Sequence, residues 1–355
     1  MRNRVLLSAA ALVAMVALSA CGSKEPASQG EGAKAALHVR VAAQNNSGQV
    51  FQFVAEERGF LKEEGVDSEL VYINNATDAF TAMAAGQIDI MSTYGTGGPL
   101  IQIANGQDFT IFGGYMIIGE TPVYGKPGTK WTGLDSFKGK TVAITRGGTP
   151  DIVLKGIFHD AGILKDVTFV EMKKNQETLQ AVASGQADFG ATATGYQLQA
   201  QALGLEVKMW PDEYWPNHSC CRMLSTSPWL SKPESQEAVY RLLRAYLRAE
   251  EYIQSESDKE RLIDLVVEKL DLDRDTAASF ILSPHMKYDT DPFRNSVLKM
   301  WDKMGAFGYL PNNSINCDDH INVAIYRKVL DSLIADYPDS EFFKKKRAAF
   351  EQNNL

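Results

Sequence analysis

The sequence predicts an α/β protein of two similar lobes, because one helix–strand–helix segment occurs twice and short apolar strands alternate with helices around both copies. Residues 82–95 read AMAAGQIDIMSTYG, and residues 181–194 read AVASGQADFGATAT. Identical residues recur 99 positions apart at Ala82 and Ala181, Ala84 and Ala183, Gly86 and Gly185, Gln87 and Gln186, Asp89 and Asp188, and Thr93 and Thr192. A 99-residue period is too long for a solenoid and fits two lobes that face each other across a cleft.

Each copy predicts the same order of elements. An alanine-rich helix ends at a Gly-Gln pair, which indicates a helix C-cap at Gly86 and at Gly185. A short strand follows, and a turn of small hydroxyl residues opens the next helix. The best-defined helix start lies in the second lobe, where Thr149 is predicted as the N-cap, Pro150 as N1 and Asp151 as part of the first turn.

Strands and helices are predicted to alternate through both lobes. Strands are expected at residues 37–43, 69–73, 89–92 and 109–115, and again at 141–145, 167–170, 188–191 and 206–209. Helices are expected between them at 50–58, 78–85, 98–105, 151–160, 176–184 and 196–202. This alternation is typical of mostly parallel sheets with helices on both faces. Residues 117–126 and 211–224 are expected to be extended and to cross between the lobes, forming a hinge at the base of the cleft.

A helical tail is predicted from Ser231 onwards. Residues 231–234 (SKPE) have the pattern of a capping box, and an apolar helical stripe follows them. Further helices are expected at 259–270, 273–281, 291–304, 318–337 and 341–352. These helices are expected to wrap the first lobe and the hinge. The predicted organisation is therefore a first lobe of residues 37–120 plus 216–355 and a second lobe of residues 121–215.

The N-terminus resembles a bacterial lipoprotein signal peptide. Arg2 and Arg4 precede an apolar run, and residues 18–21 read LSAC. A transmembrane anchor is disfavoured, since the run is about 14 residues long and a span needs about 20. We expect a signal peptide over residues 1–20, a lipidated Cys21 and a solvated tether that ends at residue 36. The folded body would then be extracytoplasmic and anchored to the cell membrane.

Composition and charge narrow the class of protein further. The 355 residues are 45% hydrophobic and 23% charged, as in an ordinary globular protein of two or three domains. Removal of Arg2 and Arg4 changes the net charge from −8 to −10, which disfavours a nucleic-acid partner. The cysteines other than Cys21 are Cys220, Cys221 and Cys317. An odd number cannot all pair, and a vicinal ring, a bond to Cys317, reduced thiols and buried small hydrophobes all stay open.

With these features in order, the chain resembles the solute-binding proteins of ATP-driven importers in the nitrate, sulfonate, taurine and thiamine-pyrimidine-precursor group. The resemblance covers about residues 37–310 and is carried by residues 84–90 (AAGQIDI), 134–144 (LDSFKGKTVAI), 183–189 (ASGQADF) and 229–239 (WLSKPESQEAV). It implies a type II periplasmic-binding fold that closes over a ligand and docks on a membrane permease.

The loops after the strands are the predicted ligand site, because ligands of open α/β sheets lie beyond the carboxyl ends of strands, where helix N-termini present free N–H groups. The candidates there are Asn45, Asn46, Ser47, Ser92, Thr93, Tyr94, Gly114, Arg146, Gly148, Thr149, Thr192 and Thr194. Tyr214, Trp215, His218, Cys220 and Cys221 on the return crossing are further candidates. Ser47 and Thr149 have helix capping as an alternative role, and Tyr214, Trp215 and His218 have ordinary packing of the hinge. The resemblance supports these positions without assigning their individual roles.

The predicted function is the capture of a small molecule between two lobes for delivery to an ABC permease, by a monomer without cofactor or metal. An anion such as a sulfonate would use Arg146 and the helix start at Thr149, whereas a flat heterocycle would use Tyr94, Tyr214 and Trp215. An enzyme similar to the thiamine-pyrimidine synthases and a ligand sensor for a membrane receptor are the alternatives. Catalysis is disfavoured, because the sequence has no phosphate loop, no Ser-His-Asp order and no paired carboxylates suited to acid–base work.

Overall fold

The computed structural model describes residues 36–45, 49–256, 258–311 and 314–355, and residues 36–355 form one compact unit. The predicted signal peptide, Cys21 and all of the tether up to residue 35 lie outside the described residues, as do Asn46 and Ser47. In the described ranges, the helices lack the combination of length and apolar character that a bilayer crossing requires.

The first sheet has the strand order β2 (Val66–Tyr72), β1 (Leu37–Ala43), β3 (Ile90–Met91), β10 (Cys221–Thr226), β4 (Phe109–Ile118) and β11 (Lys287–Tyr288). Strand β1 pairs in parallel with β2, in a register that sets Leu37 opposite Val66, and in parallel with β3. Strand β10 is antiparallel to both β3 and β4, and β11 is antiparallel to β4.

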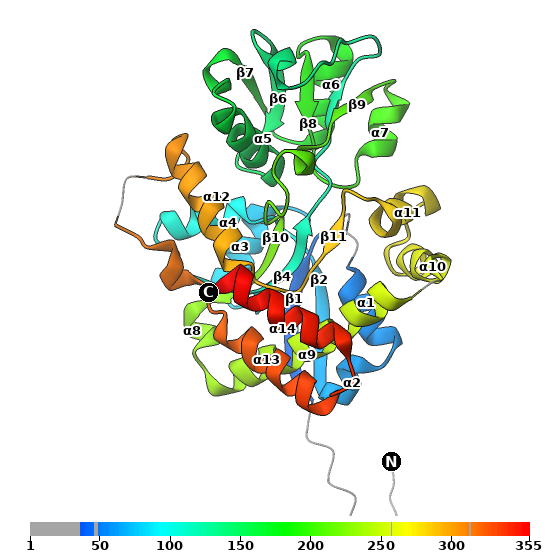
Figure 1. Ribbon diagram of the computed structural model, residues 1–355, viewed down its shortest axis with the longest axis vertical. Coiled ribbons are helices and arrows are strands. Elements are labelled where there is room, and N and C mark those ends of the chain that lie inside the picture. Colours follow the sequence, from blue (N-terminus) through cyan, green and yellow to red (C-terminus); the bar gives the residue numbers. More distant parts are fainter. Residues whose placement is uncertain (1–35, 46–48, 257, 312–313) are drawn as a thin grey trace, which may run out of the picture. The chain divides into compact units, whose positions relative to one another are not determined.

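The second sheet repeats this plan in the order β7 (Thr168–Met172), β6 (Thr141–Thr145), β8 (Phe189–Ala191), β5 (Val123–Gly125) and β9 (Glu206–Met209). Strand β6 is parallel to β7 and β8, and β5 is antiparallel to β8 and β9. The chain passes from one sheet to the other twice (Figure 1). It leaves the first sheet at β4 and enters the second at β5, and it leaves the second at β9 and returns to the first at β10. The two predicted crossings are therefore confirmed. They also make both sheets mixed, because each crossing strand enters antiparallel to its neighbours.

The repeated Gly-Gln-X-Asp segment has the same structural role in both sheets. Gly86 and Gly185 adopt positive φ angles of 68° and 84° where their helices end. Gly185 is the helix C-cap, as predicted, whereas in the first copy the C-cap is Ala85 and Gly86 follows it. Asp89 Oδ2 accepts from the backbone N–H of Arg40 at 2.8 Å, and Asp188 Oδ2 accepts from that of Thr141 at 2.9 Å. Each aspartate thus ties the strand after the repeated helix to the strand that pairs with it in parallel, β1 or β6. The Gly-Gln-X-Asp segment therefore holds the strands of each sheet together.

Helices pack on both sheets. The first carries α1 (Val50–Glu57), α2 (Phe60–Glu64), α3 (Ala76–Ala84) and α4 (Gly97–Ala104), and the second carries α5 (Thr149–Asp160), α6 (Asn175–Ser184) and α7 (Gln197–Ala202). Short 3₁₀ turns lie at Leu134–Phe137, Leu164–Asp166, Pro211–Glu213 and Cys317–His320. The buried faces form three apolar clusters, one of which joins Met91 and Leu100 of the first lobe to Ile144 and Ile152 of the second. Burial of each such side chain contributes about 1.5–3 kcal/mol.

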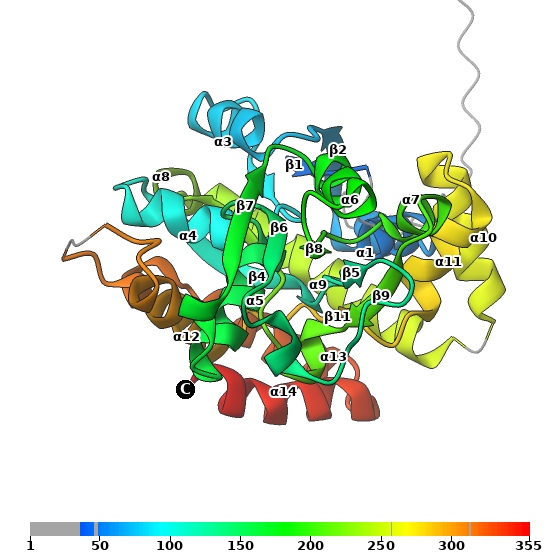
Figure 2. The ribbon, with the colours of Figure 1, turned by 90° about the horizontal axis from the view of Figure 1, so that it is seen from above.

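The C-terminal third is helical, as predicted. It consists of α8 (Ser227–Leu230), α9 (Pro233–Ser255), α10 (Lys259–Leu270), α11 (Arg274–Leu282), α12 (Arg294–Ala306), α13 (Ala324–Asp336) and α14 (Glu341–Asn354). Helix α9 contacts α1, α2 and α13, and α14 contacts α12 and α13 (Figure 2). Helix α12 also contacts α5, so the tail touches both lobes.

Several local predictions were wrong, each for a tertiary reason. Thr149 is the first residue of α5, and Gly148 is its N-cap; the Thr149 hydroxyl donates instead to a carbonyl on the return crossing. The capping box at residues 231–234 does not form, because α9 starts after Lys232 and the Ser231 hydroxyl donates to the carbonyl of Pro228. The helix predicted over residues 318–337 is a 3₁₀ turn followed by α13, and the tail contributes the unpredicted edge strand β11.

Candidate functional site

Buried polar atoms gather where the two crossings run between the sheets. Several of them accept or donate no hydrogen bond of standard geometry among the described residues, although buried polar groups in proteins are nearly always paired. We define the junction cluster as Glu120, Thr121, Tyr124, Thr192, His218, Ser219 and Tyr288, whose side chains share this property. The cluster lies on β5 and β11, just after β8, and on the segments that connect β4 to β5 and β9 to β10. Such a set is expected at a site that is completed by a ligand.

Glu120 is the charged member of the cluster. Its side chain is almost completely buried, and neither carboxylate oxygen accepts a hydrogen bond of standard geometry from a described residue. Burial raises the pKa of Glu120, while the nearby Ser283 hydroxyl and Gln197 amide act in the opposite direction. The backbone carbonyl of Glu120 accepts from the Thr194 hydroxyl at 3.2 Å. Glu120 is therefore held in place through its backbone while its carboxylate stays available.

Hydroxyl groups surround this carboxylate. Tyr124 on β5 and Thr192 after β8 face each other, and Glu120 lies near enough to Tyr124 to act with burial in raising the pKa of that phenol. Burial also raises the pKa of Tyr288 on β11, and the charge of Glu120 adds to the effect. The hydroxyl of Thr121 is buried beside the same crossing. One carboxylate and several hydroxyls thus form a buried, polar and acceptor-rich surface.

The return crossing contributes a strained segment. Asn217 and Ser219 have φ angles of 52° and 61°, in the left-handed region that residues other than glycine seldom adopt. Between them His218 is fully buried, and neither ring nitrogen forms a hydrogen bond of standard geometry with a described residue, although the backbone of Trp215 lies close to the ring. Burial lowers the pKa of His218 to about 4, so the ring is neutral at pH 7. Backbone strain of this kind is typical of functional segments.

The two lobes and the return crossing meet at the carbonyl of Cys220. The hydroxyl of Thr96, before α4 of the first lobe, donates to this carbonyl at 3.2 Å, and the hydroxyl of Thr149, at the start of α5 in the second lobe, donates to it at 3.3 Å. Gly95 permits the approach, because a Cβ there would lie 2.6 Å from the Thr149 hydroxyl. Thr149 therefore fastens the lobes together.

Most of the candidate ligand-binding residues of the first lobe form hydrogen bonds to the backbone of that lobe. Ser92 donates to the carbonyl of Ala42 at 3.2 Å, Thr93 accepts from the backbone N–H of Gln44 at 3.0 Å, and Tyr94 donates to the carbonyl of Ile73 at 2.6 Å. Asn45 is exposed, and its backbone N–H donates to the Asn74 side chain. Their contact with a ligand stays a prediction.

Gly114 lies inside the first sheet, away from the junction. Its backbone N–H donates to the carbonyl of Thr290 at 2.8 Å, and an added Cβ would lie 2.2 Å from the Asp291 carbonyl and 2.6 Å from Arg222 Nη1. This tight packing against the segment after β11 explains the glycine and argues against the predicted ligand contact.

The aromatic candidates on the return crossing divide into two cases. Trp215 is buried against Gly156 of α5, and the Lys303 ammonium lies 5.0 Å from its ring centroid, so the alternative of hinge packing describes its place. Tyr214 is 42% exposed and packs less closely. Trp210, which the sequence analysis did not single out, stacks on His285 with a centroid distance of 3.9 Å.

Within the described part of the chain, Cys220, Cys221 and Cys317 are buried free thiols. The sulfur atoms of Cys220 and Cys221 lie 3.6 Å apart, and the contact with Cys221 together with burial raises the pKa of Cys220. Among the described residues no group of histidine, cysteine and carboxylate side chains has the arrangement of a metal site. Near Cys317, Asp318 pairs with Arg294, and His320 bonds the carbonyl of Phe109.

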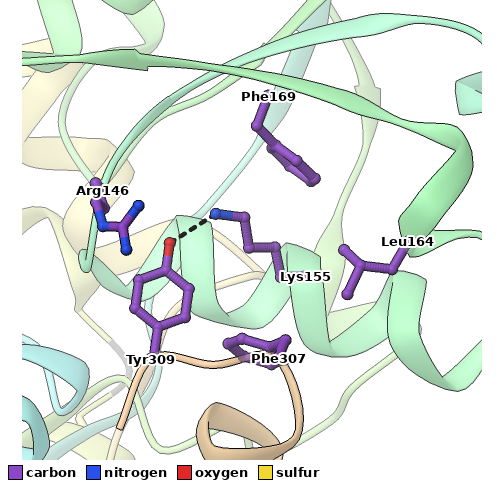
Figure 3. A pocket seen from close by; sticks show the side chains of 6 residues that line it. All are labelled: Arg146, Lys155, Leu164, Phe169, Phe307 and Tyr309. Atoms are coloured by element: carbon purple, nitrogen blue, oxygen red, sulfur yellow. Dashed lines mark hydrogen bonds between the residues drawn. The ribbon is translucent and has the colours of Figure 1, made fainter. Parts of the chain in front are cut away.

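Arg146 lines a separate pocket of about 230 Å³ between the second lobe and the tail, together with Lys155, Leu164, Phe169, Phe307 and Tyr309 (Figure 3). Both cations there already have carboxylate partners: Arg146 pairs with Glu171 at 2.6 Å, and Lys155 pairs with Asp151 at 2.8 Å. Lys155 also donates to the Tyr309 hydroxyl at 2.6 Å. The pocket thus has little net charge, and ligand binding by Arg146 or by Gly148 at the neighbouring helix start stays a prediction.

Sequence reasoning found His218, Thr192 and Thr194 but missed Glu120, Tyr124 and Tyr288. One signal was available for the first of these, since Glu120 is an isolated acid within the otherwise apolar residues 115–125. Tyr288 gave no such signal, because β11 belongs to the tail and reaches the first sheet only through tertiary contacts.

Comparisons with known proteins agree with this architecture. A model of the family described as NMT1/THI5 like matches residues 46–260. No curated protein matches the chain. The aliphatic sulphonate-binding protein SsuA of Escherichia coli aligns over 80% of this chain and 97% of its own, with 18% identity and a TM-score of 0.65.

Two further structures share the fold. The alkanesulfonate-binding protein SsuA of Xanthomonas axonopodis pv. citri, bound to MOPS, aligns over 82% of this chain and all of its own, with 17% identity and a TM-score of 0.66. The nitrate-binding protein NrtA of Synechocystis PCC 6803 aligns over 90% of this chain and 99% of its own, with 15% identity and a TM-score of 0.68. These similarities establish a two-lobed periplasmic-binding-protein fold. Because the family match covers more than half of the 355 residues, the chain belongs to the NMT1/THI5-like family.

Proposed function

We propose that this protein is the solute-binding component of an ABC-type import system, and that it captures a small molecule between its two lobes and delivers it to a permease. The observation that carries the proposal is the junction cluster, whose buried polar groups lie where the two sheets exchange strands. The family and the fold agree with it, since the structures that share the fold include sulphonate-binding and nitrate-binding proteins.

The proposed mechanism is a shift between open and closed arrangements of the lobes. A ligand that bonds to the junction cluster supplies partners to groups that are costly to bury alone, and this stabilises the closed form. The bonds from Thr96 and Thr149 to the Cys220 carbonyl would form on closure, because they join both lobes to one crossing. A permease would then distinguish the loaded protein by the shape of its closed lobes.

We further propose that the protein acts as a monomer, lipid-anchored through Cys21 outside the cytoplasm, with lobes divided near residues 120 and 215. Binding without turnover is the expected activity. The support is the signal-peptide pattern of residues 1–21 and the exchange of strands at the two crossings. Mass spectrometry of the mature N-terminus from a bacterial host tests the lipid anchor directly.

Native mass spectrometry of the purified protein tests the binding function. We expect a retained small molecule, or stabilisation in a thermal-shift screen of sulfonates, nitrate, bicarbonate and nitrogen heterocycles. A ligand at 100 times its dissociation constant adds about 2.7 kcal/mol to the free energy of unfolding. The variant T192V, which removes a hydroxyl of the junction cluster, should weaken binding by about tenfold.

The matched control is T178V, which removes another fully buried threonine hydroxyl of the same lobe, one that is bonded within its own helix. We expect T178V to leave ligand affinity unchanged. Conversion of a bound compound into a new product would contradict the binding role, and so would equal effects of T192V and T178V on affinity.

A further inference from the structure

We propose that Cys220 and Cys221 are a redox modification site, at which a low-molecular-weight disulfide oxidises the two adjacent thiols to a vicinal disulfide and thereby loosens the contact between the lobes. A thiol reductant reverses the reaction. The modification itself follows from the geometry of the return crossing. Its effect on solute capture rests on the proposed function, in which the lobes open and close.

The first step is the distance between the two sulfur atoms. The Sγ atoms of Cys220 and Cys221 lie 3.6 Å apart as free thiols. A disulfide bond is about 2.0 Å long, so a combined shift of about 1.6 Å closes the ring. Consecutive Cα atoms are about 3.8 Å apart, whereas disulfides usually span about 4.4–6.8 Å between Cα atoms, so the closed ring is strained. Strained disulfides are readily reduced, and the bond is therefore expected to be reversible.

The second step is the peptide group between the two cysteines, because the lobes meet at its carbonyl. The Cys220 carbonyl accepts from the hydroxyl of Thr96 in the first lobe at 3.2 Å and from that of Thr149 in the second at 3.3 Å. This peptide group is part of the ring that a vicinal disulfide closes. When the sulfur atoms approach each other, the peptide group has to turn, and its carbonyl moves away from both hydroxyls. Oxidation therefore removes two hydrogen bonds that join the lobes.

The third step is the position of the Cys220 sulfur between the two crossings. An added Cβ at Gly119, on the segment from β4 to β5, would lie 2.3 Å from Cys220 Sγ. The backbone N–H of Cys220 donates to the carbonyl of Ile117 on the same segment at 3.2 Å. A movement of Cys220 is therefore transmitted to the outgoing crossing as well as to the return crossing.

The oxidation proceeds as a thiol–disulfide exchange. Contact with Cys220 lowers the pKa of Cys221 and the charge of Arg222 acts in the same direction, although burial opposes them. The Cys221 thiolate attacks one sulfur of the reagent and releases the first reagent thiolate. Cys220 then loses its proton and attacks Cys221 Sγ in the mixed disulfide, which releases the second. The protons of the two cysteines end on the two released thiols, so the protein loses two electrons and the reagent gains them.

The opening of the lobes provides the path to the buried thiols. Thr96 and Thr149 approach the Cys220 carbonyl from opposite lobes, and Gly95 lies beside Thr149. Separation of the lobes removes this cover. The open form is therefore the form that a disulfide reagent oxidises, and the closed form protects the thiols.

The first experiment detects the ring itself. The full mature chain is incubated in glutathione buffers that range from fully reduced to fully oxidised, denatured, treated with N-ethylmaleimide and mapped by peptide mass spectrometry. In oxidising buffers we expect the peptide with Cys220 and Cys221 to lack two hydrogen atoms and to take up no maleimide, and dithiothreitol should restore it. Cys317 is also buried and serves as the internal control, because it should take up maleimide in every buffer.

The second experiment measures the contact between the lobes by hydrogen exchange. The amides of Leu100 and Ile152 lie in the first turns of α4 and α5, where they donate to the carbonyls of Thr96 and Gly148. We expect oxidation to make both amides exchange about tenfold faster, as the loss of a hydrogen bond at each helix start allows.

Two threonine variants make a matched pair for this measurement. T149V lacks one of the two hydroxyls that bond the Cys220 carbonyl, so oxidation should change the exchange of Ile152 much less in this variant. T178V removes a buried threonine hydroxyl that is bonded within its own helix, and it should respond to oxidation as the unaltered protein does.

Three results would overturn the inference. They are maleimide on both cysteines even in the most oxidising buffer, a stable bond to glutathione or to Cys317 in place of the ring, and a ring that leaves the exchange of Leu100 and Ile152 unchanged. Native mass spectrometry decides the proposed function separately. If the ring forms and loosens the lobes but no solute is retained in either redox state, solute binding is contradicted and the redox site remains.

Discussion

The helices of the tail and the junction between the sheets both bury polar side chains, but they treat them in opposite ways. Under α14, Lys346 donates to Glu250 at 2.9 Å and to Asp289, and Glu250 also accepts from the Thr290 hydroxyl at 2.6 Å. The Tyr326 hydroxyl lies 2.9 Å from that of Thr290. We call these five residues the tail network. Each forms a hydrogen bond of standard geometry with another member, whereas the side chains of the junction cluster form none with the described residues.

The contrast indicates which buried polar groups build the fold and which await a ligand. A paired network repays part of its desolvation within the protein, and removing one partner is costly. An unpaired cluster lowers stability until a ligand supplies its bonds. Removing a polar group should therefore lower the stability of the unliganded protein in the tail network, whereas in the junction cluster it should mainly weaken ligand binding.

The largest effect is expected in the tail network, from K346M. Methionine keeps most of the side-chain volume but leaves the buried Glu250 and Asp289 facing each other without a cation. We expect the free energy of unfolding to fall by about 3–5 kcal/mol, as measured by urea denaturation. The neighbouring K345M removes an exposed charge and should change it by less than about 0.5 kcal/mol. Equal effects of the two substitutions would contradict the contrast.

The next effect is a loss of stability in acid that arises from His218. Burial lowers its pKa from 6.5 to about 4, so the unfolded chain binds a proton between these values and the folded chain does not. The stability from this group is therefore present above pH 6.5 and is lost as the pH falls towards 4, to the extent of about 3 kcal/mol.

The variant H218Q isolates this contribution. Between pH 7 and pH 4.5, the free energy of unfolding of the unaltered protein should fall relative to that of H218Q. A difference that is constant over this range would show that His218 is not buried in its neutral form.

The smallest effect compares two tyrosines. Y326F removes a hydroxyl that donates within the tail network and should cost about 1 kcal/mol. Y124F removes a hydroxyl of the junction cluster, and it should change the stability of the unliganded protein by less than about 0.5 kcal/mol while weakening ligand binding. Denaturation and ligand titration of both variants make the comparison. A larger loss of unliganded stability in Y124F than in Y326F would reverse the assignment of the two regions.

The aspartates shared by the two copies of the repeat form ion pairs of different geometry and burial. Asp89 is bonded by the guanidinium of Arg40 at 2.7 Å and is 10% exposed, whereas Asp188 is bonded by Lys140 at 3.3 Å and is 40% exposed. Bidentate arginine and burial both strengthen such pairs. The ion pair of Asp89 should therefore stabilise the first sheet more than the ion pair of Asp188 stabilises the second.

Much of the fold followed from local patterns. Strand β9 and helix α10 begin and end where they were predicted, and β6 does as well. These elements are defined by runs of apolar residues with clear caps or turns, so neighbouring residues suffice to identify them. The start of α9 was misplaced, because the Ser231 hydroxyl was satisfied by Pro228 of α8, which the sequence pattern did not reveal.

Less of the candidate site could be predicted. Its position at the crossings was expected, and His218, Thr192 and Thr194 lie there. Thr149 was expected to cap a helix or bind a ligand, but it bonds a carbonyl 71 residues away in the sequence. Gly114 was expected near the end of a strand over residues 109–115, and it lies inside β4, which continues to Ile118.

The sequence by itself determined the duplication, the alternation of strands and helices within the two lobes, and the two places where the chain passes between sheets, because each depends on periodicity and on residues close together in the chain. The tertiary structure alone decided which polar groups remain without partners. Glu120, His218 and Tyr288 come from separate segments, and only their joint burial removes water from all three. Whether a buried group is paired depends on every neighbour that folding brings to it, and no local pattern contains that information.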